Sequence, residues 1–479
     1  MLRLDRSVLP SGQFWGLLVT FTWLFLTGGS SRGDVQSLAL LNPAMIFCCG
    51  AAMLTLKAEH WRGKKWLLAS CMLVFFMFGC YVTPVPAQLY EFLRGPDNVS
   101  AIRATVGVSD TLNVLAIAPA SAWQSLYFLF SPAAVLLFAI QLNASDLRLT
   151  VPVMIFFGTF SGMIGILQLV GSAGGPMYFY DITNNGSAVG LFANRNHAAV
   201  LLACLFPMLA LSATKSQVTD ALHRKKRLVA IATVIILVPL ILVTGSRSGL
   251  LAAIIGLIGG MLVYISHRPS HYYSKTAAKV MAIISASTLL SLVFITIYFS
   301  RAEAIDRIFV ERGTANTRAD FWTSSVDLLS QYFPVGFGPG SFVVAFQTNE
   351  PIALLSGNYL NRLHNDWLET ALTFGVPGLM LSLGAIAYYA TRTYKLWLYM
   401  DGLCRSVALN RTASIVIAIL IIASTSDYPL RTPAMMGFFA LVLVWFLEPP
   451  RAPMVNKGLA TPSSHPQSRP RHDILTNLF

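Results

Sequence analysis

The strongest sign of chemistry in this sequence is a short polar cluster that precedes a long apolar run. His364, Asn365 and Asp366 follow Arg362, and the apolar run continues to about Arg392. This pattern predicts a helix whose N-terminal end carries a partial positive charge. That charge would lower the pKa of His364, keep the imidazole neutral at about pH 7 and leave it able to accept a proton.

The N-terminal end of the same helix is also suited to an anion such as phosphate, because its first N–H groups lack partners within the helix. A neutral base beside an anion site indicates group transfer from a phosphorylated donor. A second interpretation is that His364 and Asn365 only cap the helix. This stretch alone favours neither interpretation over the other.

The composition indicates a membrane protein. Of the 479 residues, 55% are hydrophobic and 11% are charged, which is about half the charged fraction of a soluble domain. Apolar runs recur from residue 14 to residue 447. They predict an all-α fold, a polytopic membrane helix bundle with about 12 transmembrane helices.

The distribution of basic residues sets the expected topology. With both termini in the cytoplasm, all lysines and most arginines fall on the cytoplasmic side, and every basic residue on the outer side is an arginine. This asymmetry follows the positive-inside rule. The net charge of +13 is therefore attributed to cytoplasmic loops, and we expect no nucleic-acid partner. Outer arginines also suit phosphate, because a guanidinium group donates two parallel hydrogen bonds.

The same pattern divides the chain into four regions. We expect roughly the first nine membrane helices in residues 1–300, an outer loop with short helices in residues 301–365, and the remaining membrane helices in residues 366–447. The tail at residues 448–479 is rich in Pro, Ser and basic residues and is expected to be disordered and cytoplasmic. Turn-forming residues dominate the part of the loop at residues 334–342.

Ligand-type residues show no metal-binding pattern. The six cysteines lie in apolar runs or in a basic loop, without the spacing of metal ligands. We therefore expect them to be packing residues. The glycine-rich run at residues 334–342 has no following Lys-Ser/Thr pair, which excludes a nucleotide-binding P-loop.

Two arginines outside the polar cluster are candidates for anion binding. Arg247 lies in a very short connection, residues 244–249, between two apolar runs. An arginine that faced lipid there would be costly, so we expect it to face a cavity or an anion; the alternative is an arginine that extends to the membrane surface. Arg318 lies in the large outer loop and is by itself an ordinary loop arginine.

Polar residues at two other helix ends are also candidates. Asn194, Arg195 and His197 stand at the start of one apolar run and either contact a substrate or cap the helix. Asp427 interrupts an apolar run directly before Tyr428. Its carboxylate either orients a partner base or caps a helix end.

These residues together resemble a known family. His364, Asn365, Gly375 and Gly378 fit the pattern H[NSQ]x9Gxx[GTY], which resembles the signature of the O-antigen ligase and O-antigen polymerase superfamily of bacterial membrane glycosyltransferases. The preceding order of segments, with Asn194–His197, then Gly245–Gly249, then Arg318, is also similar. The resemblance covers about residues 190–380.

The resemblance implies a multi-pass protein of the bacterial inner membrane with a large periplasmic loop and an active site that faces the periplasm. It implies a glycosyltransferase that uses no metal, cofactor or nucleotide sugar. The implied donor is a glycan linked to undecaprenyl diphosphate, and membrane lipids surround the protein. The implied acceptor is lipid A-core, as in lipopolysaccharide biosynthesis, or a growing polysaccharide, as in exopolysaccharide biosynthesis.

Roles for single residues also follow from the resemblance. His364 corresponds to the essential base that activates the acceptor hydroxyl, and direct displacement would invert the anomeric carbon. Arg247 and Arg318 correspond to the arginines that bind the donor diphosphate. The remaining candidates for substrate binding are Asn194, Arg195, His197, Asn365 and Asp427.

Several alternatives stay open. A ligase and a polymerase differ only in acceptor, and a protein hydroxyl is a third, less favoured acceptor. The alternative from another class is a twelve-helix transporter or flippase of a lipid-linked glycan. Such folds usually show related halves and charged residues at mid-membrane. This sequence shows no matching halves, and its polar residues cluster at the outer face.

Overall fold

The computed structural model describes residues 9–94, 113–214, 220–267, 312–352, 360–400 and 404–449. For residue 220, residues 312–320 and residue 405 it describes the backbone alone. Within these ranges the regular structure is helical and contains no strand, so the predicted all-α class is confirmed.

The described helices share the long apolar sequences that the composition predicted. In chain order they are α1 (Gly12–Thr27), α2 (Leu38–Leu54), α3 (Ala58–Trp61), α4 (Lys65–Val82), α5 (Ala87–Arg94), α7 (Pro119–Phe128), α8 (Phe130–Ala139), α9 (Ala144–Val170), α10 (Arg195–Ser212), α11 (Asp220–Val243), α12 (Arg247–Ser266), α15 (Arg312–Tyr332), α16 (Phe342–Gln347), α17 (Asp366–Leu398), α18 (Arg405–Ala423), the 3-10 helix η3 (Pro429–Arg431) and α19 (Pro433–Leu447).

Eight of the described helical segments are long and apolar enough to cross a membrane, with α7 and α8 counted as one. The shorter apolar helices α1, α2 and α19 pack among them. A membrane helix bundle is thus confirmed, whereas the count of about twelve is not. Residues 268–300 of the region expected to hold the first nine membrane helices, the start of the outer loop at residues 301–311 and the tail after residue 449 lie outside the described residues.

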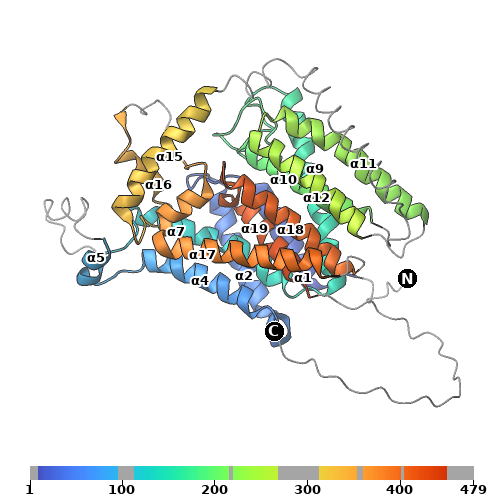
Figure 1. Cartoon of the computed structure of the whole chain (residues 1–479), viewed down its shortest axis with the longest axis horizontal. Coiled ribbons are helices and arrows are strands. Elements are labelled where there is room, and N and C mark those ends of the chain that lie inside the picture. Colours follow the sequence, from blue (N-terminus) through green and yellow to red (C-terminus); the bar gives the residue numbers. More distant parts are fainter. Residues whose placement is uncertain are drawn as a thin grey trace, which may run out of the picture.

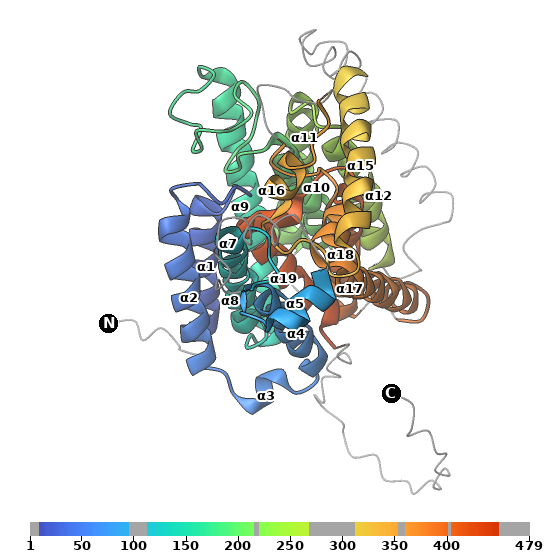
Figure 2. The same ribbon diagram turned by 90° about the vertical axis from the view of Figure 1, so that its left-hand side faces the viewer.

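Helix α10 lies at the centre of one group of the described helices. Figure 1 shows α9, α10, α11 and α12 on one side of the molecule and α15 and α16 on the other. Figure 2 shows the N-terminal helices α1 and α2 along a third side. Helix α10 packs against α9, α11, α12 and α18, and it is buried along most of its length because apolar residues occupy all its faces.

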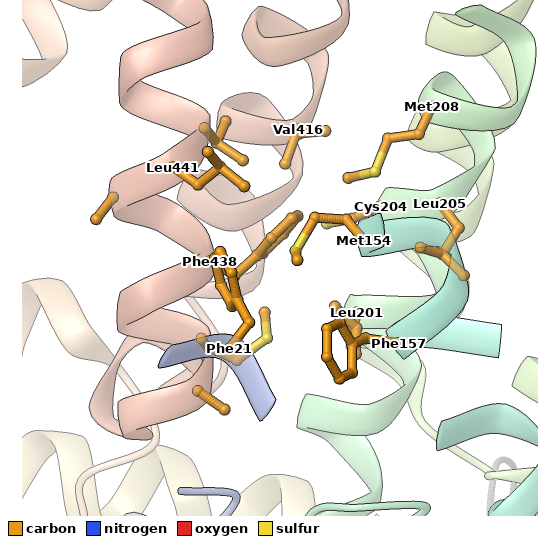
Figure 3. Close-up of a cluster of buried hydrophobic side chains, with 14 of the residues drawn as sticks. Phe21, Met154, Phe157, Leu201, Cys204, Leu205, Met208, Val416, Phe438 and Leu441 are labelled. Carbon is orange, nitrogen blue, oxygen red and sulfur yellow. The ribbon is translucent and has the colours of Figure 1, made fainter. Parts of the chain in front are cut away.

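The close approach of α12 to α10 depends on small residues. A Cβ atom on Gly256 of α12 would lie 2.5 Å from the Ala203 carbonyl oxygen of α10. Small residues at helix interfaces allow this approach within membranes. One large apolar cluster extends from this interface, and it includes Phe157 of α9, Leu205 of α10 and Phe438 of α19 (Figure 3).

Helix α17 is broken at Gly375, and the break is explained by the sequence around it. Pro377 has no N–H group, so the Thr373 carbonyl four residues earlier has no partner in the helix. Gly375 has φ 55° and ψ −135°, a backbone conformation outside the helical region. Only glycine adopts it readily. Because of the kink, backbone groups on this side of α17 have no hydrogen-bond partner within the helix.

The turn-rich segment at residues 334–342 satisfies those groups. The N–H of Val376 donates to the Pro334 carbonyl at 2.9 Å, and the N–H of Gly338 donates to the Thr373 carbonyl at 3.0 Å. The N–H of Phe337 donates to the carbonyl of Leu372 at 3.0 Å. The predicted turn is therefore confirmed, and it is attached to the helix that follows His364.

Replacement of Gly375 by alanine tests this attachment. The added methyl group would lie 1.9 Å from the Pro334 carbonyl oxygen, in a conformation that L-residues avoid. We expect Gly375→Ala to lower the free energy of unfolding by about 1–3 kcal/mol, measured as a lower melting temperature in detergent. Gly384→Ala is the matched control, since no atom lies within 4 Å of the Cβ position at Gly384 of the same helix. Equal losses in the two variants would contradict the explanation.

Candidate active site

His364 has a left-handed backbone conformation directly before helix α17. Its φ is 56°, which is uncommon for a residue other than glycine and is found more often at functional sites. Asn365 is the N-cap of α17, and its Oδ1 accepts hydrogen bonds from the N–H groups of Trp367 and Leu368, both at 3.1 Å. The capping interpretation therefore holds for Asn365, whereas His364 lies outside the cap.

Hydrogen bonds on both sides of His364 hold it in this conformation. The N–H of Leu363 donates to Glu369 Oε2 at 3.1 Å, and the indole N–H of Trp322 donates to the Leu363 carbonyl at 2.9 Å. On the other side, the N–H of Asp366 donates to the C-cap carbonyl of α18 at 2.9 Å. Three helices, α15, α17 and α18, thus fix the backbone around the histidine.

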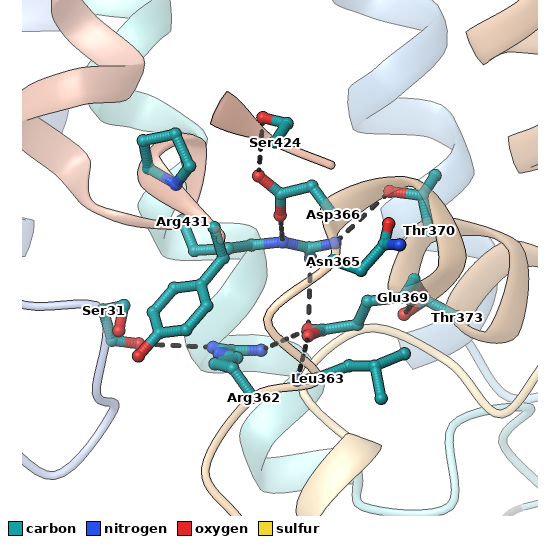
Figure 4. Close-up of polar contacts among 12 residues, drawn as sticks. Ser31, Arg362, Leu363, Asn365, Asp366, Glu369, Thr370, Thr373, Ser424 and Arg431 are labelled. Atoms are coloured by element: carbon teal, nitrogen blue, oxygen red, sulfur yellow. Dashed lines mark hydrogen bonds and ion pairs between the residues drawn. The ribbon is translucent and has the colours of Figure 1, made fainter. Parts of the chain in front are cut away.

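Two carboxylates in the first turn of α17 form a buried network with two arginines (Figure 4). Arg362 Nη1 lies 3.0 Å from Glu369 Oε1, and Arg431 Nη1 lies 3.7 Å from the same oxygen. Arg431 Nε also donates to Asp366 Oδ1 at 2.8 Å. Burial alone would lower the pKa of Arg431, but the two carboxylates outweigh it and raise that pKa above its usual value. Arg362 also donates to the Ser31 carbonyl at 3.2 Å, which ties this network to the N-terminal part of the chain.

The structure does not support the phosphate site expected at the start of α17, and the reason is electrostatic. Asp366 and Glu369 already occupy the positive end of this helix, and a phosphate there would meet two buried carboxylates. Helices α10 and α12 differ, because neither has an acidic residue in its first turn and each begins at an arginine, Arg195 or Arg247.

Asp427 lies between two histidines that come from different parts of the chain. Its Oδ1 atom is 3.4 Å from His364 Nδ1 and 3.6 Å from His197 Nε2. Both separations exceed usual hydrogen-bond lengths. Asp427 is 0% exposed and His197 1% exposed, whereas His364 is 24% exposed. Of these three side chains, His364 is the one that a substrate can reach.

The charge on Asp427 is stabilised by several donors. Burial alone would raise its pKa, but contacts with His197 and His364 outweigh burial and hold the pKa of Asp427 well below its usual range. The Asn196 side chain donates to Oδ2, and the N–H of Tyr428 donates to Oδ1 at 2.9 Å. Asp427 therefore remains a carboxylate at neutral pH.

Tyr428 packs against both histidine rings. Its ring centroid lies 4.8 Å from that of His364 and 4.9 Å from that of His197, in edge-to-face arrangements. The Asn194 side chain donates to the Tyr428 hydroxyl at 3.4 Å, and burial raises the pKa of that hydroxyl. Tyr428 is thus a neutral side chain that helps to set the orientation of the two rings.

The N-terminal ends of α10 and α12 lie next to this cluster. Asn194 caps α10 and Ser246 caps α12 through their side-chain oxygens. The guanidinium group of Arg195 lies beside the turn between α11 and α12, with Nη1 3.7 Å from the position of a Cβ on Gly245. Arg247 is the first residue of α12, and its side chain is exposed. Two arginines and two helix N-termini therefore meet at this edge of the site.

Arg318 is described by its backbone alone. Its backbone lies in α15, one helical turn before Trp322, whose indole contacts the backbone next to His364. Its side chain lies outside the described residues. Its role in binding a diphosphate therefore stays a prediction.

Most predicted site residues lie in or beside one cluster, namely Asn194, Arg195, His197, Arg247, His364, Asn365 and Asp427. Sequence reasoning missed Asn196 and Tyr428, although each is adjacent to a predicted residue. It also missed the pairing of Glu369 with Arg431, because no local spacing links positions so far apart.

Within the described ranges, no group of three or more His, Cys, Asp or Glu residues is placed to hold a metal ion.

Comparison with protein families agrees with this assembly. Residues 231–383 match the O-antigen ligase family. The matched segment includes Arg247, Arg318 and the full motif from His364 to Gly378, but it excludes Asp427 and the start of α10. A search among curated proteins found no match to the chain.

The fold and site define a polytopic helical membrane protein with a histidine–carboxylate site at one end of its bundle. The family match agrees with the resemblance and supports a protein of the O-antigen ligase and polymerase type over residues 231–383.

The geometry around Asp427 generates a prediction about its charge. Asp427→Asn keeps the size of the side chain but removes the charge that faces both histidines. We expect glycan transfer to fall by about 10²- to 10⁴-fold, as for carboxylates that orient a catalytic histidine elsewhere, while the protein still inserts and stays folded. Asp34→Asn, at a residue whose side chain is 64% exposed, is the control and should keep full activity. Full activity in Asp427→Asn would exclude this role.

Proposed function

We propose that this protein transfers a glycan from an undecaprenyl-diphosphate-linked donor to an acceptor hydroxyl at the periplasmic face of the inner membrane. The observation that carries the proposal is the contact of Asp427 with His364, the histidine of the family motif, beside the arginine-bearing ends of α10 and α12. A base and an anion site thus lie next to each other, as group transfer from a diphosphate requires.

In the proposed reaction His364 is the general base. With Nδ1 directed to Asp427, Nε2 is the ring nitrogen that takes the proton of the acceptor hydroxyl. The acceptor oxygen attacks the anomeric carbon and forms the new glycosidic bond. The bond between that carbon and the diphosphate oxygen breaks, and its electron pair leaves with undecaprenyl diphosphate. Attack opposite the leaving group inverts the anomeric carbon.

The proposed diphosphate site lies at the N-terminal ends of α10 and α12. Arg195 and Arg247 provide guanidinium groups there, and the helix ends provide partial positive charge without a competing carboxylate in either first turn. These groups oppose the negative charge that grows on the leaving diphosphate. The chemistry written in this way requires neither a nucleotide sugar nor a metal. Arg318 is a further proposed ligand of the diphosphate.

The proposed orientation rests on the basic residues. Among the described residues, the His364 end of the bundle carries Arg195, Arg247, Arg362 and Arg431 and no lysine, whereas the helix ends on the opposite side carry the lysines of α4 and α11. The positive-inside rule then puts the opposite end and both termini in the cytoplasm.

A reconstituted assay tests the reaction and distinguishes the acceptors. Purified protein is mixed with undecaprenyl-diphosphate-linked glycan, with and without lipid A-core, and released undecaprenyl diphosphate and glycan size are measured. Release that requires lipid A-core identifies a ligase, and release with a ladder of lipid-linked chains identifies a polymerase.

We expect His364→Ala to lower release by about 10²-fold or more, and His223→Ala, at the other end of the bundle, to have no effect. Absence of release with several donors would favour the transporter.

Arg247→Lys tests the way in which the diphosphate is bound. Lysine keeps the positive charge but cannot donate two parallel hydrogen bonds. We expect transfer to fall by at least about tenfold, measured as undecaprenyl diphosphate release. Arg224→Lys in α11 provides the control, because that arginine is exposed at the opposite end of the bundle. Unchanged activity in Arg247→Lys would rule out two-pronged binding by this residue.

A further inference from the structure

A second hollow lies at the end of the bundle opposite His364. It has a volume of about 710 Å³ and is formed by the N-terminal parts of α9, α11 and α18, the last turn of α10 and the residue that follows α12. Helix α10 separates it from the His364 site, and its 18 residues correspond to roughly 27 Å. This hollow is therefore distinct from the proposed reaction site.

The rim of this hollow is basic. Arg148 of α9, Lys225 and Lys226 of α11 and His267 after α12 all line it. No aspartate or glutamate is among its described lining residues. The nearby carboxylate of Asp146 is buried and accepts hydrogen bonds from the N–H of Ser11 and from the side chain of Asn143. The charge of the rim thus suits an anionic group.

The wall of the hollow is apolar. Leu149 and Ile155 of α9 line one side, and Val229 of α11 lines another. Leu149 is 42% exposed and Val229 is 57% exposed. Both belong to helices that are long and apolar enough to cross a membrane. Such surfaces face acyl chains in a bilayer. A soluble phosphate compound would leave this wall uncovered.

We propose that this hollow binds an anionic phospholipid. The phosphate diester lies at the basic rim, within reach of Lys225, Lys226 and Arg148, and an acyl chain lies against the wall formed by Leu149 and Val229. Basic hollows between transmembrane helices recognise lipid headgroups in this way. The bound lipid would fill the space between α9 and α11 and hold the two helix ends together. This inference does not depend on the proposed reaction.

The test measures lipid binding to the full-length protein directly. Detergent-solubilised protein is titrated with phosphatidylglycerol or with phosphatidylcholine of the same acyl chains, and bound lipid is counted by native mass spectrometry. We expect a clear preference for phosphatidylglycerol. The double variant Lys225→Gln/Lys226→Gln should weaken phosphatidylglycerol binding by about tenfold and leave phosphatidylcholine binding unchanged. Absence of any preference in the unaltered protein overturns the proposal.

A matched control distinguishes a site from general surface charge. Arg224 and Arg227 flank the two lysines on α11 and are exposed, but they do not line the hollow. Arg224→Gln/Arg227→Gln removes the same net charge from the same helix, and we expect it to keep phosphatidylglycerol binding. An equal loss in both double variants would show that only overall charge attracts the lipid, which overturns the site.

Two further measurements separate a lipid from a free phosphate compound. Val229→Trp adds bulk to the apolar wall, so phosphatidylglycerol binding should fall although every basic residue is kept. Excess soluble glycerol phosphate should not displace the lipid. Displacement by glycerol phosphate, or full binding in Val229→Trp, would mean that the acyl chain makes no contact in the hollow and would contradict the proposal.

Discussion

A buried carboxylate must be balanced by donors and positive charges, and this constraint organises the functional end of the protein. Asp427 has no exposure to solvent, and two histidines and a side-chain amide from α10 surround it. Glu369 and Asp366 are balanced in the same manner by Arg362 and Arg431. Because these partners come from distant parts of the chain, neutralising the charges also fixes how α10, α17 and α18 approach one another. The contacts that satisfy electrostatics are therefore the contacts that build the site.

Much of this end of the protein could be predicted from local sequence. Long apolar runs predicted the helices, and the polar residues at their ends predicted where chemistry would gather. The role of the motif glycine Gly375 is also local in origin, because Pro377 removes a donor and forces the backbone to find other partners. The structure identifies those partners as backbone groups of the turn that begins at Pro334. The sequence shows that the helix must break near Pro377. The segment that hydrogen-bonds to the broken part is known only from the tertiary structure.

Other features could not be predicted from one sequence. His197, His364 and Asp427 meet around one oxygen atom, yet no spacing rule links positions in three separate helical regions. The error about phosphate at the start of α17 has a similar origin. The partial positive charge at the N-terminal end of the helix was predicted correctly. The prediction did not recognise that Asp366 and Glu369 already balance that charge. Long-range pairing with Arg431 decides that assignment, and such pairing is visible only in three dimensions.

The attachment of residues 334–338 to the broken part of α17 has a consequence for how such a protein can change. His364 is held by its own set of hydrogen bonds, and the turn at Pro334 is held by another set on the same helix. The chain between these two fastened points contains α16, and both of its ends are fixed by the scaffold. Its exposed positions, such as Val344, can therefore vary without moving the histidine, whereas Phe342 and Phe346 are buried and constrained by packing. Substitutions can therefore accumulate on the exposed side of this segment while the position of His364 stays constant.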